Sequence, residues 1–353
     1  DIDPALGAVE AKLRAYFDPL VDAPAPHRYA RLERQLLLAN DLPGVTVSGT
    51  LRPARAEADE PPPIGAAALL VTARREAFGE GLVILDNFGS TFTGETELTA
   101  SVSSFSRTRL GERLTLSGLV SSEPDEFAER QKVIQASGVA HPGTQGWDVD
   151  AFVSYGTSIP AGELQRFDFE SAKLLLRLGT GYWFVRGQDL SLRGTIAFDY
   201  VDDDTDIEED TPFSRDKLRV VEVAGRLSAR DRFRGINDVV VRLRQGLPIL
   251  GASRRGDPDT TNPDGTGLAA TLGATVLRVQ PIAAGFSVFG RVGAQYGFDS
   301  VLANEEFDVG GLRFGRGFNP KEIAGDHGVG VTAELRYDRA FEDVAFLEAV
   351  QPF

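Results

Sequence analysis

The sequence predicts a mainly β protein, in which a small α+β domain precedes an antiparallel β-barrel that spans a membrane. Two observations favour this fold. From about residue 81 onward, apolar and polar residues alternate with a period of two, and the connections between the alternating segments are mostly short and long in turn. Alternation places one face of a strand in an apolar medium and the other in water. Membrane barrels join their strands by short turns at one end and longer loops at the other.

The alternating segments give about twelve complete strands. Examples are residues 113–120, 147–155, 170–184, 189–200 and 236–247. Short connections lie near 107–112, 142–146, 185–188, 230–235 and 280–285, and long polar ones near 121–129, 160–168, 201–216, 248–266 and 300–327. The link near 88–94 is the exception, because it is short where the alternation requires a long loop. A soluble sandwich also alternates along its strands, but a Greek-key sandwich has no reason to sort its loops by length.

The first 80 residues follow a different pattern. Apolar residues recur at helical spacing within 9–17 and again within 27–41, before turn residues at 40–44. Residues 45–51 then alternate as a strand, and a second strand at 68–76 follows a proline-rich segment at 53–63. The order helix, helix, strand, strand predicts a small α+β domain.

Composition limits the classes of function. The chain of 353 residues has a net charge of −15, which disfavours nucleic-acid binding because phosphates require a basic surface. It contains no cysteine, which excludes a disulfide framework and thiol chemistry. No apolar run approaches the roughly 20 residues of a membrane-spanning helix. Because the chain begins at Asp1 and contains no methionine, we expect it to be a processed form or a fragment.

Residues 306–338 form the most informative segment. Four glycines surround one arginine, and an acidic residue and a Gly-Asp turn follow before an alternating strand begins near 329. The residues of this motif are Gly310, Gly311, Gly315, Arg316, Gly317, Phe318, Glu322, Gly325 and Asp326. Long loops inside a compact fold are uncommon and usually carry function. The glycines at 315 and 317 permit a sharp hairpin with close backbone approach.

The spacing GG-x4-RGF-x3-E-x2-GD-x-G resembles the sixth extracellular loop of the two-partner secretion transporters, the hemolysin secretion/activation family of the outer membrane. Residues 81–118 resemble the first barrel strands of this family, and residues 32–53 resemble its polypeptide-transport-associated (POTRA) domain. The resemblance implies a partial periplasmic POTRA domain over 1–80 and an outer-membrane barrel over 81–353. Family barrels have 16 strands, so the barrel is expected to be truncated at the C-terminus, where residues 350–353 begin a thirteenth strand.

The resemblance also implies a role for Arg316. In the family this arginine sits at the tip of a loop that folds into the lumen, where it meets an acidic residue of the inner wall. That residue is expected on a strand just beyond Phe353, and Phe318 is expected to anchor the tip against the wall. A guanidinium inside a pore needs a carboxylate partner to offset its desolvation. The alternative is a solvated arginine in an extracellular loop, and the sequence GRGF departs from the more common VRGF.

A second set of charged residues is predicted to face the lumen. Its principal members are Arg193, Arg242, Arg244, Arg291, Arg336 and Glu334, and a wider set adds Arg177, Arg226, Glu97, Asp148, Asp150, Asp199 and Glu222. A hydrated lumen of mixed sign could pass an unfolded polypeptide without binding it tightly. The alternative is cross-strand ion pairing inside a polar barrel, which contributes little for each exposed pair.

Other candidate motifs favour simpler interpretations. The acidic run 202–210 lacks the glycine turn and terminal glutamate of a calcium-binding EF-hand, which leaves a solvated loop as the better interpretation. The Arg-Gly-Asp sequence at 255–257 is attributed to chance. The three histidines (His27, His141 and His327) do not form a metal-binding pattern, and no catalytic motif is present. We therefore predict a protein that is not an enzyme and has neither cofactor nor metal.

These inferences predict a pore that secretes an unfolded partner exoprotein, of hemolysin or adhesin type, from the periplasm to the cell surface. The N-terminal domain would capture the partner through a strand edge, and the barrel would lie in outer-membrane lipid. Three alternatives stay open: an assembly factor for outer-membrane proteins from the same superfamily, a passive diffusion porin, and a soluble β-rich binding protein.

Overall fold

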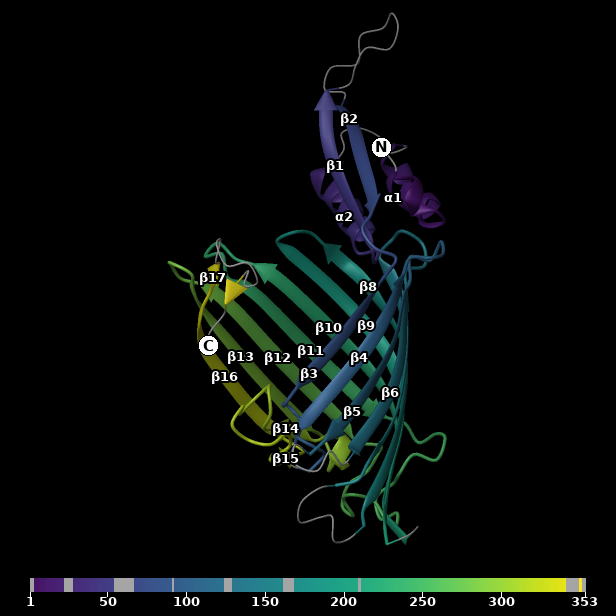
Figure 1. Cartoon of the computed structure of the whole chain (residues 1–353), viewed down its shortest axis with the longest axis vertical. Coiled ribbons are helices and arrows are strands. Elements are labelled where there is room, and N and C mark those ends of the chain that lie inside the picture. The colour runs from purple at the N-terminus through teal and green to yellow at the C-terminus, as the bar shows by residue number, and fades with distance from the viewer. Residues whose placement is uncertain are drawn as a thin grey trace, which may run out of the picture.

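The computed structural model describes residues 3–21, 28–53, 67–90, 92–123, 129–160, 168–208, 211–340 and 349–350. Two units follow each other along the chain (Figure 1). The first contains two helices and a two-stranded sheet, and the second is a curved antiparallel sheet of twelve strands. None of the helices in the described ranges is long and apolar enough to cross a membrane.

The N-terminal unit packs its helices against a short hairpin. Its elements are the turn η1 (Pro4–Leu6), helices α1 (Val9–Val21) and α2 (Tyr29–Asn40), and the antiparallel strands β1 (Val45–Pro53) and β2 (Ala67–Arg75). Its core consists of apolar side chains from all five elements and from the turn after α2: Leu6, Val9, Leu13, Tyr16, Leu38, Ala39, Leu42, Val45, Val47 and Ala73. The predicted order of two helices and two strands is confirmed. The helical spacing places the apolar residues on the faces that meet the hairpin.

Asn40 covers part of the outer edge of β1. Its Nδ2 donates to the carbonyl of Val47 at 2.6 Å, and its Oδ1 accepts from the N–H of Val47 at 2.8 Å. The backbone groups of Val47 therefore point away from β2, and the two-residue period of a strand makes those of Gly49 and Leu51 do the same. The amide of Asn40 takes the place of one residue of a neighbouring strand, and the edge from Gly49 onward lies beyond this cap.

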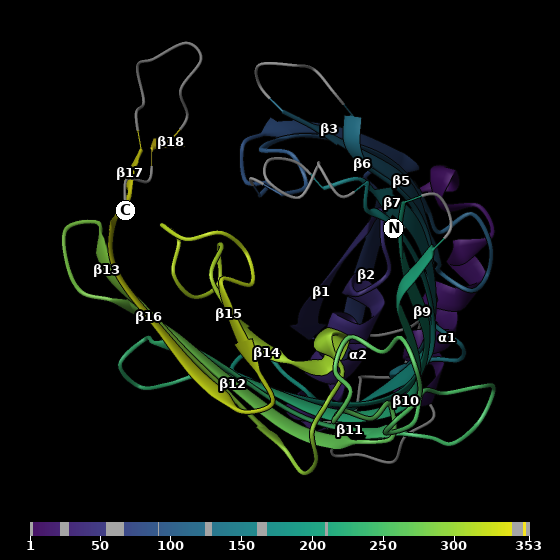
Figure 2. The ribbon, with the colours of Figure 1, turned by 90° about the horizontal axis from the view of Figure 1, so that it is seen from below.

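The large sheet is an up-and-down meander, in which each strand pairs antiparallel with its neighbour in the sheet. Its twelve strands match the number predicted, and they curve into an open arc in the described residues (Figure 2). The strands are β3 (Gly79–Asp86), β4 (Thr96–Phe105), β5 (Arg113–Ser122), β6 (Glu129–Ala140), β7 (Trp147–Ser158), β8 (Glu170–Arg186), β9 (Leu190–Ile207), β10 (Thr211–Arg230), β11 (Ile236–Gly246), β12 (Ala270–Pro281), β13 (Phe286–Gly297) and β16 (Gly328–Tyr337).

The structure corrects one predicted loop. Residues 201–216 were expected to form a long polar connection, but β9 continues to Ile207 and β10 begins at Thr211. Acidic residues of this stretch pair with cations on neighbouring strands: Asp202 with Arg219 at 2.8 Å and Asp203 with Lys173 at 2.9 Å. Such cross-strand pairs stabilise a ladder of polar residues. The pattern within one strand does not reveal them, because the partners lie on other strands.

The predicted thirteenth strand is also corrected. Strand β18 (Ala349–Val350) pairs with β17 (Arg339–Ala340) in a separate two-stranded sheet, and neither strand extends the large sheet. Residues 351–353 lie outside the described ranges.

The two faces of the large sheet differ in chemistry. On β16, Val329, Val331 and Leu335 are 60–68% exposed on one face, while Glu334 and Arg336 point to the other. Exposed apolar side chains recur in this way on the other strands, and contiguous patches of this extent are rare on soluble monomers. The other sheets in the described residues have two strands each. The sheet of β1 and β2 belongs to the N-terminal unit, and the others pair only two or three residues per strand, so no second large sheet stacks on either face. The alternation therefore separates an apolar outer face from a polar, concave inner face.

The N-terminal unit sits at the end of the sheet that carries the short turns (Figure 1). At the end of β8, Arg186 donates from Nε and Nη2 to the two carboxylate oxygens of Asp41, at 2.9 and 2.6 Å. Arg34 of α2 donates to the carbonyl of Trp183 at 2.6 Å. Lys12 of α1 donates to turn carbonyls, and burial lowers the pKa of this lysine. Charged side chains of the N-terminal unit thus bind the turns between sheet strands.

Another turn at this end holds an acidic residue with a perturbed pKa. Asp231 accepts hydrogen bonds from Nη1 of Arg278 at 2.6 Å and from the backbone N–H groups of Phe233 and Gly235, each at 3.0 Å. The neighbouring guanidinium is the main cause that lowers the pKa of Asp231 from 3.8 to about 2. The ionised carboxylate therefore stabilises the folded turn.

A depressed folded-state pKa gives stability that is present above the unfolded pKa of 3.8 and is lost as the pH falls toward about 2. We expect Asp231→Asn to lower the midpoint of thermal unfolding near neutral pH, and the difference from wild type to shrink between pH 3.8 and 2. Thermal unfolding in detergent followed by circular dichroism measures this difference. Asp189→Asn, in the neighbouring turn, serves as the control. A difference that stays constant down to pH 2 would contradict the assigned ion pair.

Candidate functional site

The connection between β13 and β16 folds back against the concave face of the sheet (Figure 2). This segment, residues 298–327, is called the inner loop below. It contains the turn η3 (Ala303–Glu305) and the paired strands β14 (Phe307–Val309) and β15 (Ile323–Gly325). Near its end, Asp326 accepts hydrogen bonds from the N–H of Val301 at 3.0 Å and from Oγ of Ser300 at 3.1 Å. All nine predicted motif residues lie in the inner loop.

Arg316 reaches from the inner loop to the wall of the sheet. Its Nη2 lies 2.7 Å from Oε1 of Glu334 on β16, and Nη2 of Arg336 lies 2.7 Å from the other oxygen of the same carboxylate. The side chain of Glu334 is only 10% exposed, so it requires cationic partners to offset desolvation. In the described residues, Glu334 on the strand that follows the loop is thus an acidic partner of Arg316. The partner expected on a strand beyond Phe353 stays a prediction. Glu334 was predicted to face the lumen but not to pair with Arg316.

The aromatic anchor of the inner loop differs from the predicted one. Phe318, the predicted anchor, is 66% exposed, whereas Phe314 is 7% exposed. Phe314 lies over Gly293 of β13 and Gly330 of β16, which are direct partners in the sheet. A Cβ at either glycine would come within 2.6 Å of the phenylalanine ring. The ring therefore fills a space that exists only because both positions lack a side chain. In the sequence, this anchoring site is marked only by the glycines at inward positions of the two strands.

Backbone conformation accounts for three of the motif glycines. Gly310, Gly311 and Gly315 have φ of +123°, +68° and +95°, a region that other residues rarely adopt. The N–H of Gly310 donates to the carbonyl of Phe314 at 2.6 Å, which closes the turn that carries the anchor. Gly317 has no such torsion. The predicted hairpin is therefore set mainly by glycines before Arg316.

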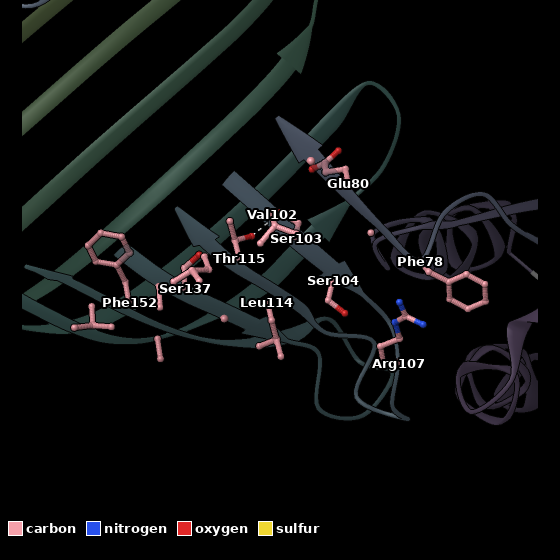
Figure 3. Close-up of a pocket in the computed structure, with 17 residues that line it drawn as sticks. Phe78, Glu80, Val102, Ser103, Ser104, Arg107, Leu114, Thr115, Ser137 and Phe152 are labelled. Atoms are coloured by element: carbon pink, nitrogen blue, oxygen red, sulfur yellow. Dashed lines mark hydrogen bonds between the residues drawn. The ribbon is translucent and has the colours of Figure 1, made fainter. Parts of the chain in front are cut away.

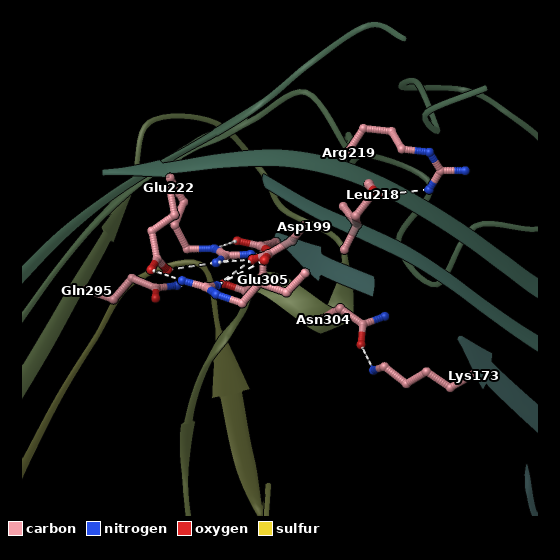
Figure 4. Close-up of polar contacts among 10 residues, drawn as sticks. Lys173, Asp199, Leu218, Arg219, Glu222, Gln295, Asn304 and Glu305 are labelled. Atoms are coloured by element: carbon pink, nitrogen blue, oxygen red, sulfur yellow. Dashed lines mark hydrogen bonds and ion pairs between the residues drawn. The ribbon is translucent and has the colours of Figure 1, made fainter. Parts of the chain in front are cut away.

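Five charged side chains form a network where the inner loop meets the wall (Figure 4). Arg177 of β8 donates to Asp199 of β9 at 2.9 and 3.1 Å and to Glu222 of β10 at 2.7 Å. Arg244 of β11 donates from Nη1 to the same two carboxylates, at 2.8 and 2.9 Å. Its Nε and Nη2 donate to the two oxygens of Glu305 in the loop, at 2.9 and 2.8 Å. The predicted inward residues meet here, but no pattern in the sequence marks Glu305.

Other predicted inward residues make separate contacts on the same face. Arg193 pairs with Asp148, and Arg226 pairs with Asp238 at 2.8 Å. These pairs join strands that are neighbours or near neighbours in the sheet. They agree with the simpler interpretation of cross-strand ion pairing, which the sequence left open.

The remaining predicted arginines of this face lie against aromatic rings or beside a small cavity. Arg336 and Arg291 lie 4.0 and 5.4 Å from the ring centroid of Phe289, within the range of cation–π attraction. Arg242 lines a cavity of about 240 Å³ together with Asp150. Within the described ranges, no ion pair involves Arg242.

The acidic residues of β9 are occupied by cations of the protein. Arg219 is buried, lies 3.5 Å from the ring centroid of Tyr200, and donates to Asp202 at 2.8 Å. The described residues contain no group of three or more histidines and carboxylates that could hold a metal ion. The prediction of a solvated loop at 202–210 is therefore replaced by an ion-paired hairpin over its described part.

A hollow of about 990 Å³ runs along β3 to β7 (Figure 3). Its lining is mostly apolar or small, and it includes Leu114, Val102 and Phe152. The hydroxyls of Ser103 and Thr115 bond each other there at 2.9 Å. The hollow lies on other strands than the inner loop and its charged network.

Comparisons with known proteins identify a family match and several solved structures of similar fold. The family described as haemolysin secretion/activation protein ShlB/FhaC/HecB matches residues 65–352. A search of curated protein sequences gave no match. Among solved structures, CdiB from Escherichia coli aligns with a TM-score of 0.76 at 20% identity, over 97% of this chain and 62% of that chain. CdiB from Acinetobacter baumannii aligns with a TM-score of 0.71 at 14% identity, over 97% and 59%.

BamA from Haemophilus ducreyi, in a structure that lacks POTRA domains 1–3, is similar at a lower level. Its TM-score is 0.52 at 12% identity, over 98% of this chain and 68% of that chain. At such low identities, these TM-scores show a shared fold and nothing more. The chain spans about three fifths of the length of the two CdiB structures.

The antiparallel meander of twelve strands resembles the sheets of outer-membrane β-barrel transporters, and the family match indicates an outer-membrane protein of a Gram-negative bacterium. The chain belongs to the haemolysin secretion/activation family ShlB/FhaC/HecB, whose members are two-partner secretion transporters.

Proposed function

We propose that the complete protein is a translocation pore that secretes an unfolded partner exoprotein from the periplasm to the cell surface. The observation that carries this proposal is the inner loop, which is held against a polar, ion-paired concave wall by Arg316 and Phe314. A loop in that position obstructs the lumen of a closed barrel of 16 strands. The ion pair of Arg316 and the ring of Phe314 are the contacts that passing cargo would have to displace. The cargo is of hemolysin or adhesin type.

The N-terminal unit acts in this proposal as part of a periplasmic POTRA domain over residues 1–80, which captures the cargo. An extended cargo segment would add a strand to the edge of β1. The outward backbone groups of Gly49 and Leu51 supply the donors and acceptors, while Asn40 closes the edge at Val47. The contacts of Arg186 with Asp41 and of Arg34 with the carbonyl of Trp183 support this role, because they join the N-terminal unit to the short-turn end of the sheet.

The proposal predicts that loss of the protein stops export of its partner exoprotein. In a strain that lacks the gene, we expect the partner to accumulate in the periplasm, where it is degraded, and to disappear from the medium. Immunoblots of medium and periplasm with the partner present and the gene restored measure this effect. Other outer-membrane barrels are expected to keep their normal abundance.

The three alternatives predict different results. An assembly factor for outer-membrane proteins would leave export of the cargo intact and deplete other barrels. A passive diffusion porin would change neither export nor barrel abundance, and its channel would gate normally without Arg316. A soluble binding protein would remain in the aqueous fraction when membranes are removed without detergent.

A further inference from the structure

The base of the inner loop is fixed more firmly than its tip. Val301 and Leu302 are 0% exposed, and Leu302 packs with the core formed by Val201, Leu218 and Val220 of β9 and β10. The turn η3 follows directly after Leu302, so the packing of Leu302 fixes where its three residues contact the sheet. Figure 4 shows Asn304 and Glu305 pointing to opposite sides of this turn, toward Lys173 and toward the charged network.

Glu305 makes the most extensive of these contacts. Both of its carboxylate oxygens accept from the fork of Arg244, at 2.9 and 2.8 Å, and its backbone carbonyl accepts from Nε2 of Gln295 at 2.6 Å. The side chain of Glu305 is 12% exposed and that of Arg244 is 22% exposed. Bidentate pairing of arginine with carboxylate is a strong and geometrically specific interaction. It joins the loop to β11, whereas Arg316 joins it to β16.

The net charge of the network becomes zero when Glu305 leaves it. With the loop docked, Arg177 and Arg244 (+2) face Asp199, Glu222 and Glu305 (−3), which gives a net charge of −1. Without Glu305 the wall keeps two cations and two carboxylates, which gives a net charge of 0. Each guanidinium then still has both wall carboxylates as partners. Undocking therefore leaves no uncompensated charge on the wall, unlike the removal of a partner from an isolated buried pair.

We propose that Glu305 and Arg244 form a reversible ionic latch that holds the base of the inner loop against the wall, separately from the Arg316 contact at the tip. The proposal rests on the function proposed above, since it assigns a second holding contact to the same loop. The balanced wall allows the latch to open and close repeatedly. Glu305 is in this sense a positioning residue for the pore.

The latch can be tested without cargo, by the resting conductance of the complete protein in planar lipid bilayers. We expect Glu305→Gln to raise the resting open fraction roughly tenfold, because the carboxylate that engages the fork is lost. Glu305→Arg should raise it further, since it places a cation against Arg244. Glu306→Gln is the matched control, because Glu306 makes no ion pair in the described residues. Correct folding of each variant is checked by its heat-dependent mobility in gels.

A reversible cross-link between the loop and β13 distinguishes a latch from a residue that only stabilises the fold, because a latch makes the conductance follow the state of the cross-link. Residues 1–353 contain no cysteine, so Gln295→Cys with Glu305→Cys introduces a single pair within this part of the protein, which a short, reducible thiol reagent can bridge. We expect the unbridged double variant to conduct more than wild type, the bridged form to return to the wild-type level, and reduction to restore the higher level.

Several outcomes would overturn the latch. Glu305→Gln and Glu305→Arg that conduct like wild type and like the Glu306→Gln control would do so, and so would a bridge that leaves conductance unchanged. These results leave the proposed pore intact, because the wild-type channel would still gate. A wild-type protein that forms no channel would overturn the pore itself, and the latch with it.

Discussion

Replacement of Arg316 by alanine is expected to raise the resting open fraction of the pore about tenfold. The substitution leaves Glu334, a side chain only 10% exposed, with Arg336 as its remaining ion partner. Loss of a partner from a buried pair costs about 3–5 kcal/mol. Because the side chain of Arg316 is 40% exposed, solvent screening reduces this to about 1–1.5 kcal/mol, which corresponds to roughly tenfold in the equilibrium between docked and undocked loop.

Single-channel recording on the complete protein measures this fraction. Arg313→Ala is the matched control, because Arg313 lies in the same loop and its backbone carbonyl, which alanine keeps, accepts from Oγ1 of Thr332 at 2.7 Å. Arg316→Lys should give an intermediate value, since it keeps the charge but loses the planar fork. Equal conductance of the two alanine variants would exclude a holding role for Arg316.

Leu51→Pro is expected to reduce export of the partner exoprotein by roughly thirtyfold. Its N–H points away from β2, so proline removes a donor from the outer edge of β1 and keeps the ladder between β1 and β2. Loss of this hydrogen bond and of the one next to it costs about 2 kcal/mol in pairing with an added strand. The substitution is expected to weaken binding of the cargo to the N-terminal unit and to leave the pore unchanged.

The matched control for this position is Leu51→Ala, which removes an exposed side chain and keeps the backbone donor. Pulse–chase measurement of exoprotein in the medium compares the two variants with wild type. Conductance of the Leu51→Pro channel should equal that of wild type, which separates capture of the cargo from gating. Export at the wild-type rate by Leu51→Pro would show that the cargo does not pair with this edge.

Much of the fold was predictable because its determinants lie within single strands. The two-residue alternation located the strands, and loop lengths separated the two ends of the sheet. The hairpin at 201–216 was missed because the cations that pair with Asp202 and Asp203 lie on other strands. Alternation along one strand reports which face a residue occupies, and it carries no information about the partner across the ladder.

The candidate site was predictable in its position and only partly in its contacts. The glycine pattern located the loop and Arg316, but Phe314 and Glu334 have roles that depend on register. Gly293 and Gly330 form the surface under Phe314 only because β13 and β16 pair in one particular alignment. Glu305 is one of several acidic residues near the start of the loop, and its partner lies on β11, about sixty residues earlier. Such contacts require the three-dimensional arrangement.

The order of the strands has a consequence for how the molecule assembles. Neighbouring strands of the large sheet follow each other along the chain, so most pairings close a short length of chain, at a small entropic cost. The seam between β13 and β16 differs, because its pairing closes the whole inner loop, residues 298–327. The segment that we propose to move during secretion therefore has both of its ends fixed in the sheet by this one seam. A polypeptide that leaves through the pore would therefore displace the middle of the inner loop, while β13 and β16 keep both of its ends in the sheet.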